Sequence, residues 1–274
     1  MGQKSKQVER TNASIYTPKT PKTIKRLAAW FIDIILIIVV ATGVALMTSA
    51  IYGYDSYNNK CYQKEIEYGI YVEDPKGEFS FEDKTYTICY EVEGITKEEA
   101  STRYEKLYQD SEYREAYSKR SIGQVIIITT AIVVSITIFE LIVPLILKHG
   151  RTIGMKFFDI GYVTEEGIDV GVKEVFIRFL FGKLVVGALI PYSGIMLSFL
   201  MPTQYTIVGF VAIFGVIGIN LLLLFTTPEK RGIHDFIAKC IPCDNSCQIY
   251  FKTIEELSKA KAEDERIKNE KKYY

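Results

Sequence analysis

Arg26 and Asp33 are the first residues of this chain whose types and spacing suggest chemistry, because they lie at the start of and inside a long apolar segment. A charged side chain near the middle of a membrane-spanning helix costs roughly 2.5 to 3.5 kcal/mol on insertion scales, so it usually faces a protein interior or a water-filled cavity. A separation of seven residues is two helical turns, which places both side chains on one face about 10 Å apart along the axis. One face of this helix is therefore expected to be functional or paired.

A second acid, Glu140, lies in another apolar segment, four residues before Pro144. A proline inside a helix frees a backbone carbonyl and kinks the helix, which can mark a site. Glu140 is therefore a candidate proton-bearing group. The alternative, slightly favoured, is a Glu that is neutral or paired with Lys183 of the third apolar segment. Lys183 and Arg178 are otherwise expected to extend toward lipid headgroups.

Four apolar segments, residues 24–52, 122–147, 175–201 and 205–225, position these side chains. Each is long enough for the roughly 20 residues of a membrane helix. The first is too long for a signal peptide and follows about 26 polar residues, so we expect it to be retained. The 33 basic and 33 acidic residues cancel, which argues against nucleic acid as a partner. The sequence predicts an all-α membrane protein with four transmembrane helices in a lipid bilayer.

Charge at the N-terminus predicts the orientation. Residues 1–26 carry seven Lys or Arg against Glu9 alone, so the positive-inside rule places this end in the cytoplasm. Four crossings then place both termini in the cytoplasm of a multi-pass protein of the cell membrane. The predicted order is a cytoplasmic tail (1–23), helix one (24–52), an extracytoplasmic insert (53–120), helix two (121–147), a cytoplasmic loop (148–174), helix three (175–201), helix four (205–227), an interfacial amphipathic segment (228–250) and a charged cytoplasmic tail (251–274).

The insert is expected to be a small α+β unit. Residues 77–92 alternate apolar and polar types around residues 82–84, which predicts a hairpin. Thr96 followed by Glu99 resembles a capping box and predicts a helix start. Cys61 and Cys89 face an oxidising side in this topology, so they are candidates for a disulfide, and the alternative is two unpaired thiols.

On the inner side, residues 157–163 and 168–172 flank a polar turn and predict a hairpin within the cytoplasmic loop. Within 228–250, apolar residues recur at helical spacing and predict a short amphipathic helix. Cys240, Cys243 and Cys247 could hold a metal with His234 as a fourth ligand, but no second C-x-x-C is present, so no metal site is expected. The tail beyond residue 251 is predicted to be a capped, charged helix. Gly209, Gly215 and Gly218 are predicted close-packing positions of helix four.

Three stretches together resemble the RDD family of multi-pass membrane proteins: KRLAAWFIDIILI (25–37), GRTIGMKFFDIGYV (150–163) and KRGIHDFIAK (230–239). The arginine and two aspartates of the family match Arg26, Asp33 and Asp235. Met155 stands where the family usually has a basic residue, and Gly161 where it often has Arg. The resemblance implies an integral membrane protein, with transport suggested and cation/proton exchange reported for some members.

Two functions follow from these residues. In the first, a transporter exchanges cations and protons through Asp33 and Asp235, with Glu140, Lys183 and His234 as accessory residues. Four helices make a thin pathway, so this function calls for a homo-oligomer. In the second, a non-transporting assembly, sensor or accessory protein uses its Arg and Asp residues to lock helices together. Both lead us to expect Arg26, Asp33 and Asp235 in one polar cluster.

The sequence offers little for enzymatic chemistry. His149 and His234 are its only histidines, and no zinc-protease or serine-hydrolase motif occurs. We therefore expect neither an enzyme nor a bound cofactor.

Overall fold

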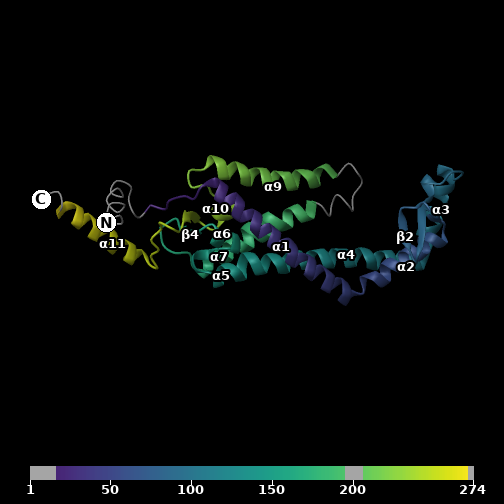
Figure 1. The fold of residues 1–274 in the computed structure, drawn as a ribbon, viewed down its shortest axis with the longest axis horizontal. Coiled ribbons are helices and arrows are strands. Elements are labelled where there is room, and N and C mark those ends of the chain that lie inside the picture. The colour runs from purple at the N-terminus through teal and green to yellow at the C-terminus, as the bar shows by residue number, and fades with distance from the viewer. Residues whose placement is uncertain (1–16, 195–205, 271–274) are drawn as a thin grey trace. The chain divides into compact units, whose positions relative to one another are not determined.

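The computed structural model describes residues 17–194 and 206–270. Within these residues, four helices are long and apolar enough to cross a membrane: Thr23–Tyr52, Ser111–Ile146, Val172–Gly194 and Gly209–Thr226. They confirm the four predicted helices (Figure 1). The predicted end of helix three, residues 195–201, lies outside the described residues, as do residues 1–16 and 271–274 of the two tails.

Two compact units make up the chain, one of residues 1–40 and 133–274 and the other of residues 41–132. The division passes through two long helices, α1 (Thr23–Tyr52) and α4 (Ser111–Thr137). Helix α1 buries three residues and exposes large apolar side chains such as Phe31 (61%) and Val39 (64%). Apolar exposure on this scale is typical of a surface that lipid covers.

Both helices that contain a proline widen into π-helical segments. Helix α4 continues as η3 (Ile138–Ile142) and α5 (Val143–Ile146), where the N–H of Val143 donates to the carbonyl of Ile138, five residues back. Pro144 has no N–H to donate to the carbonyl of Glu140, so the regular ladder is interrupted there. Helix α7 (Val172–Ile177) likewise continues as η5 (Arg178–Leu189), close to Pro191.

A helix–turn–strand unit occurs twice in the first unit of the chain. Helices α6 (Ile153–Phe157) and α10 (Ile233–Ile237) each have five residues. Each is followed by a residue with positive φ, Asp159 (53°) or Lys239 (52°), and then by a five-residue strand. The same helix, turn and strand recur 80 residues later in the sequence, so the fold contains an internal repeat.

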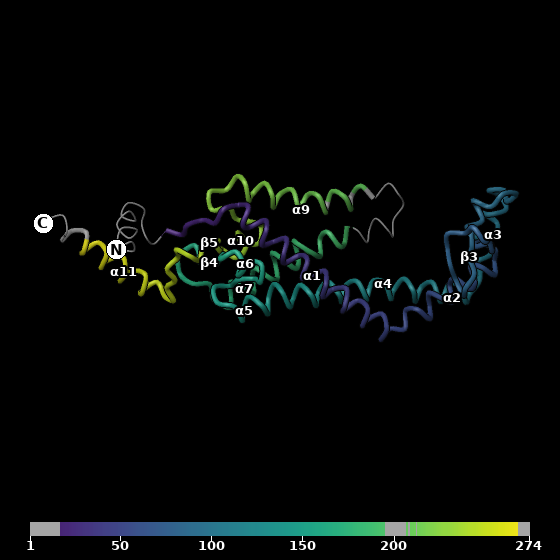
Figure 2. The backbone as a smooth tube through the Cα atoms, in the orientation of Figure 1, coloured from purple at the N-terminus to yellow at the C-terminus, as the bar shows by residue number. Residues whose placement is uncertain are grey.

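Strands β4 (Ile160–Thr164) and β5 (Cys240–Asp244) pair antiparallel and lie side by side in Figure 2. This pairing replaces the hairpin predicted within residues 148–174, of which one bridge, Val163↔Asp169, is present. It also ends the predicted amphipathic helix at Ile237. The first four residues of each strand are buried, and a strand buried on both faces lacks the alternation that would distinguish it from a helix.

The second unit contains a three-stranded sheet in the order β1-β3-β2, formed by β1 (Tyr71–Glu73), β2 (Phe79–Phe81) and β3 (Lys84–Ile88). The predicted hairpin is confirmed, and Glu82 and Asp83 form its turn with positive φ. Helix α3 (Lys97–Gln109) begins as predicted, since the N–H of Glu99 donates to the Thr96 hydroxyl (3.2 Å).

Helix α2 (Tyr54–Glu67) had no clear sequence signal. It contributes Cys61 to an apolar core with Ile70, Leu107 and two residues of α4. Cys61 and Cys89 are both buried and free, so of the two alternatives the structure has the unpaired thiols and not the disulfide. Cys61 packs in this apolar core as a small hydrophobic residue would, and burial raises the pKa of its thiol.

The C-terminal helix α11 (Ile254–Glu270) follows the strands of the first unit. Its first turn is capped by Thr253, whose hydroxyl accepts a hydrogen bond from the N–H of Glu256 (3.2 Å). The predicted capped, charged helix is thereby confirmed.

Candidate functional site

One face of α1 carries the site residues of that helix. Arg26, Ala29 and Asp33 are its buried residues, at positions i, i+3 and i+7. This confirms the single functional or paired face expected from the spacing of Arg26 and Asp33.

Asp235, on α10, is paired with two arginines. The Arg26 Nη2 atom donates to Asp235 Oδ2 at 2.6 Å, and Arg178 Nε lies 3.4 Å from Oδ1. The backbone N–H of Gly232 also donates to Oδ2 (3.0 Å). We call Arg26, Arg178 and Asp235 the arginine–aspartate cluster. All three side chains are buried, so it joins α1, η5 and α10 away from water.

Arg178 is the member that sequence reasoning missed. Its expected extension toward headgroups is wrong, since it is 5% exposed and lies over the Tyr162 ring with 4.0 Å to the centroid. It also donates to the carbonyl of Gly150 (3.2 Å). The signal that could have found it is the one that marked Arg26, an arginine at the entrance of an apolar segment.

The residues around Asp235 keep its carboxylate ionised. Burial alone would raise the pKa of Asp235, but Arg26, Arg178 and the N–H of Gly232 together hold it well below its ordinary value. Burial lowers the pKa of His234 well below its ordinary range, and nearby Lys183 and the arginines act in the same direction. The His234 ring is therefore neutral near pH 7, and the arginines supply the charge that stabilises the carboxylate.

Asp33 is held separately, by α6. The Thr152 hydroxyl donates to Asp33 Oδ2 (2.5 Å), and the N–H of Gly154 donates to Oδ1 (2.8 Å). A Cβ at Gly154 would lie 2.2 Å from the carbonyl oxygen of Ala29, so glycine is needed for α6 to approach α1.

The predicted cluster is therefore confirmed for Arg26 with Asp235 and is wrong for Asp33. Among the described residues, Asp33 has no basic group within 4.0 Å. The reason is geometric, because Arg26 lies two turns before Asp33 on α1 and its guanidinium is directed to Asp235.

Glu140 and Lys183 form the pair that the sequence slightly favoured. Lys183 Nζ lies 3.0 Å from Glu140 Oε1, and this links η3 to η5. Asp33 lies within electrostatic range of both residues. We call Asp33, Glu140 and Lys183 the cavity triad, because all three line one cavity of about 380 Å³.

His234, predicted as an accessory residue, also lines this cavity. A Cβ at Gly182 would lie 2.4 Å from the Cβ of His234, which shows how closely α10 packs on η5. The N–H of Ile233 donates to Asn220 Oδ1 (3.1 Å), which fixes α10 to helix α9 (Thr206–Thr226).

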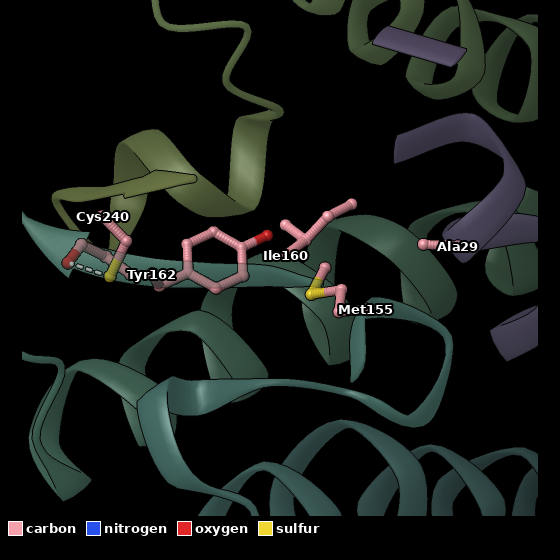
Figure 3. Close-up of a cluster of buried hydrophobic side chains, with 6 residues drawn as sticks. Ala29, Met155, Ile160, Tyr162 and Cys240 are labelled. Carbon is pink, nitrogen blue, oxygen red and sulfur yellow. Dashed lines mark hydrogen bonds between the residues drawn. The ribbon is translucent and has the colours of Figure 1, made fainter. Parts of the chain in front are cut away.

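The three C-terminal cysteines do not form a shared ligand set. Cys240 and Cys243 are three residues apart on β5, so their side chains point to opposite faces of the strand. Cys240 belongs to a buried apolar cluster with Tyr162, Ile160, Met155 and Ala29, and lies beside Tyr162 (Figure 3). Burial raises the pKa of both Cys240 and Cys243 to about 12, so both remain thiols. Within residues 17–194 and 206–270, no group of three His, Cys, Asp or Glu is placed to hold a metal.

Four apolar helices around buried charges define an integral, multi-pass membrane protein. The model of the RDD family matches residues 20–239, which is most of the chain, so this protein belongs to the RDD family. No curated protein and no solved structure matches the chain significantly.

Proposed function

We propose that this protein exchanges a monovalent cation for a proton across the membrane at the cavity triad. The observation that carries the proposal is that Asp33 lines the cavity and, among the described residues, has no basic group within 4.0 Å, whereas Glu140 is paired with Lys183. A net charge inside a membrane protein is costly. One proton or one monovalent cation neutralises the Asp33 carboxylate, so the two compete for one site.

Within the triad, the two carboxylates have different roles. Glu140 is already paired with Lys183, so a cation that binds Glu140 displaces an ammonium. Asp33 accepts hydrogen bonds from neutral donors, Thr152 and Gly154, so an incoming cation displaces no ammonium or guanidinium there. We assign Asp33 as the primary binding group and Glu140 as the second.

The arginine–aspartate cluster is assigned a positioning role. Asp235 faces two arginines, and its pKa is held low, so it has no need of a further cation or proton. This departs from the expectation that Asp235 itself binds the ion. The same contacts favour the second candidate function, a non-transporting protein in which buried ion pairs lock the helices.

Proteoliposomes that hold the purified protein distinguish the two functions. With a pH gradient imposed, addition of Na⁺, K⁺ or Li⁺ should drive proton movement that an entrapped pH dye reports. Asp33→Asn and Glu140→Gln should each reduce this flux at least tenfold while the protein remains inserted. Glu166→Gln, an exposed carboxylate of the β4–α7 loop, is the matched control and should retain it. Wild-type protein without cation-dependent proton flux would refute transport and favour the lock.

A further inference from the structure

The cavity is polar at one end and apolar at the other. Each of the four apolar helices contributes to the cavity lining two residues that are four positions apart. The residue nearer to α6 and α10 is polar, and the one further away is non-polar. These residues are Asp33 and Ile37, Glu140 and Ile136, Lys183 and Gly187, and Asn220 and Val216. Four residues are about one helical turn, or 6 Å. The charged groups thus form one end, and the next turn of every helix is apolar.

The volume exceeds what an inorganic ion needs. A water molecule occupies about 30 Å³, so an ion with six waters takes about 200 Å³. The cavity, at about 380 Å³, is within the range of about 300 to 1,000 Å³ of organic ligand sites. An apolar cavity end tends to stay dry and to accept apolar groups.

The sign of the ligand charge follows from the lining residues. Asp33 has no basic partner among the described residues, and the guanidinium of Arg26 is bound to Asp235. An anionic head group would lie against two carboxylates, and a neutral one would leave Asp33 without a counter-charge. Trp30 also lines the cavity, and an indole face attracts an organic cation.

We infer that the substrate of this site is an organic monocation, an alkyl- or arylammonium whose charged head lies at Asp33 and Glu140 and whose body fills the apolar end. The inference rests on the proposed function, because it names the cation that competes with the proton. The residues that line the apolar end, above all Val216, then select the body of the substrate.

Trp30 provides a direct test, because it is the single tryptophan of the chain and lines the cavity. Its emission in the purified protein, held in lipid nanodiscs, should change saturably with hexylammonium and with benzyltrimethylammonium. 1-Hexanol and hexanoate have bodies of the same length without the positive charge, and should bind at least tenfold more weakly. Trp30→Phe removes the signal and controls for effects of the bilayer.

Two kinds of variant separate the ends of the cavity. Asp33→Asn and Glu140→Gln should weaken hexylammonium at least tenfold. Val216→Phe fills the apolar end without touching a charge, and should weaken hexylammonium at least tenfold. Ile213→Phe, from the same helix and the same cavity wall, is the second variant should Val216→Phe fail to fold.

The outcomes distinguish this inference from the proposed function. Inorganic cation/proton exchange without any saturable response to the two ammonium compounds would overturn the inference and leave the proposed function standing. Equal binding of 1-hexanol and hexylammonium would also overturn it, because the site would then select only an apolar body. Saturable, Asp33-dependent binding of hexylammonium without proton flux would support the substrate class and refute exchange.

Discussion

Asp235 is completely buried between two arginines. Its ion pairs should therefore contribute more to stability than an ion pair on the surface does. Removing one partner of a buried pair leaves the other charges uncompensated, which costs about 3 to 5 kcal/mol. We expect Asp235→Asn to lower the free energy of unfolding by about this amount, measured by denaturation in micelles.

The matched control is the exposed pair of Lys84 with Glu73, which has the same 2.6 Å separation. Solvent screens this pair, so Glu73→Gln should cost much less than Asp235→Asn. Equal losses in the two variants would show that burial does not strengthen the arginine–aspartate cluster.

His234 gives stability a defined pH dependence. Its pKa in the folded protein lies well below the ordinary value of about 6.5, so the unfolded chain binds more protons below that pH. Stability should therefore fall as the pH drops below about 6.5, with a slope from this residue of up to about 1.4 kcal/mol per pH unit. His234→Gln should reduce the slope between pH 6.5 and 5 in thermal unfolding. Parallel curves for wild type and variant would contradict the burial of a neutral ring.

At the scale of the elements, close approach of helices depends on particular glycines. A methyl group at Gly154 would collide with the backbone of Ala29, and α6 could no longer hold Asp33 in place. Overpacking of this kind costs about 1 to 3 kcal/mol. We expect Gly154→Ala to destabilise the protein by this amount in denaturant titrations.

Gly215 of α9 is the matched control, since a Cβ there meets nothing within 4 Å. The expectation that Gly215 and Gly218 are close-packing positions is therefore wrong for the described residues. Gly215→Ala should be neutral or stabilising by about 0.5 to 1 kcal/mol, because alanine favours a helix. A larger loss at Gly215 than at Gly154 would mean that α9 is packed against groups outside the described chain.

At the scale of the whole molecule, the seven-to-one basic excess of residues 1–26 still predicts cytoplasmic termini. An impermeant thiol reagent added to intact cells should label Glu73→Cys in the insert and should not label Glu166→Cys in the loop after β4. Both positions are exposed, and a Cys247→Ser background removes the one native thiol that is only partly buried. Labelling of Glu166→Cys alone would show that the protein has the opposite orientation in the membrane.

The sequence by itself determined the features that depend on local pattern. Length and hydropathy located the four apolar helices, and the seven-residue spacing placed Arg26 and Asp33 on one buried face. Turn and cap residues located the β2–β3 hairpin and the starts of α3 and α11. Each of these features is decided within a few residues of chain, where side-chain periodicity and backbone hydrogen bonding act directly.

Only the tertiary structure decided which charges meet. Arg26 contacts Asp235 across 209 residues, and Thr152 contacts Asp33 across 119 residues. The pairing of β4 with β5 brings the repeated helix–turn–strand units together, and neither strand shows a period that would reveal its partner. Asp33 was separated from the other two residues of its motif because α6 supplies neutral donors beside it while Asp235 takes both arginines. Long-range pairing of this kind depends on the packing of the whole unit, to which no local pattern corresponds.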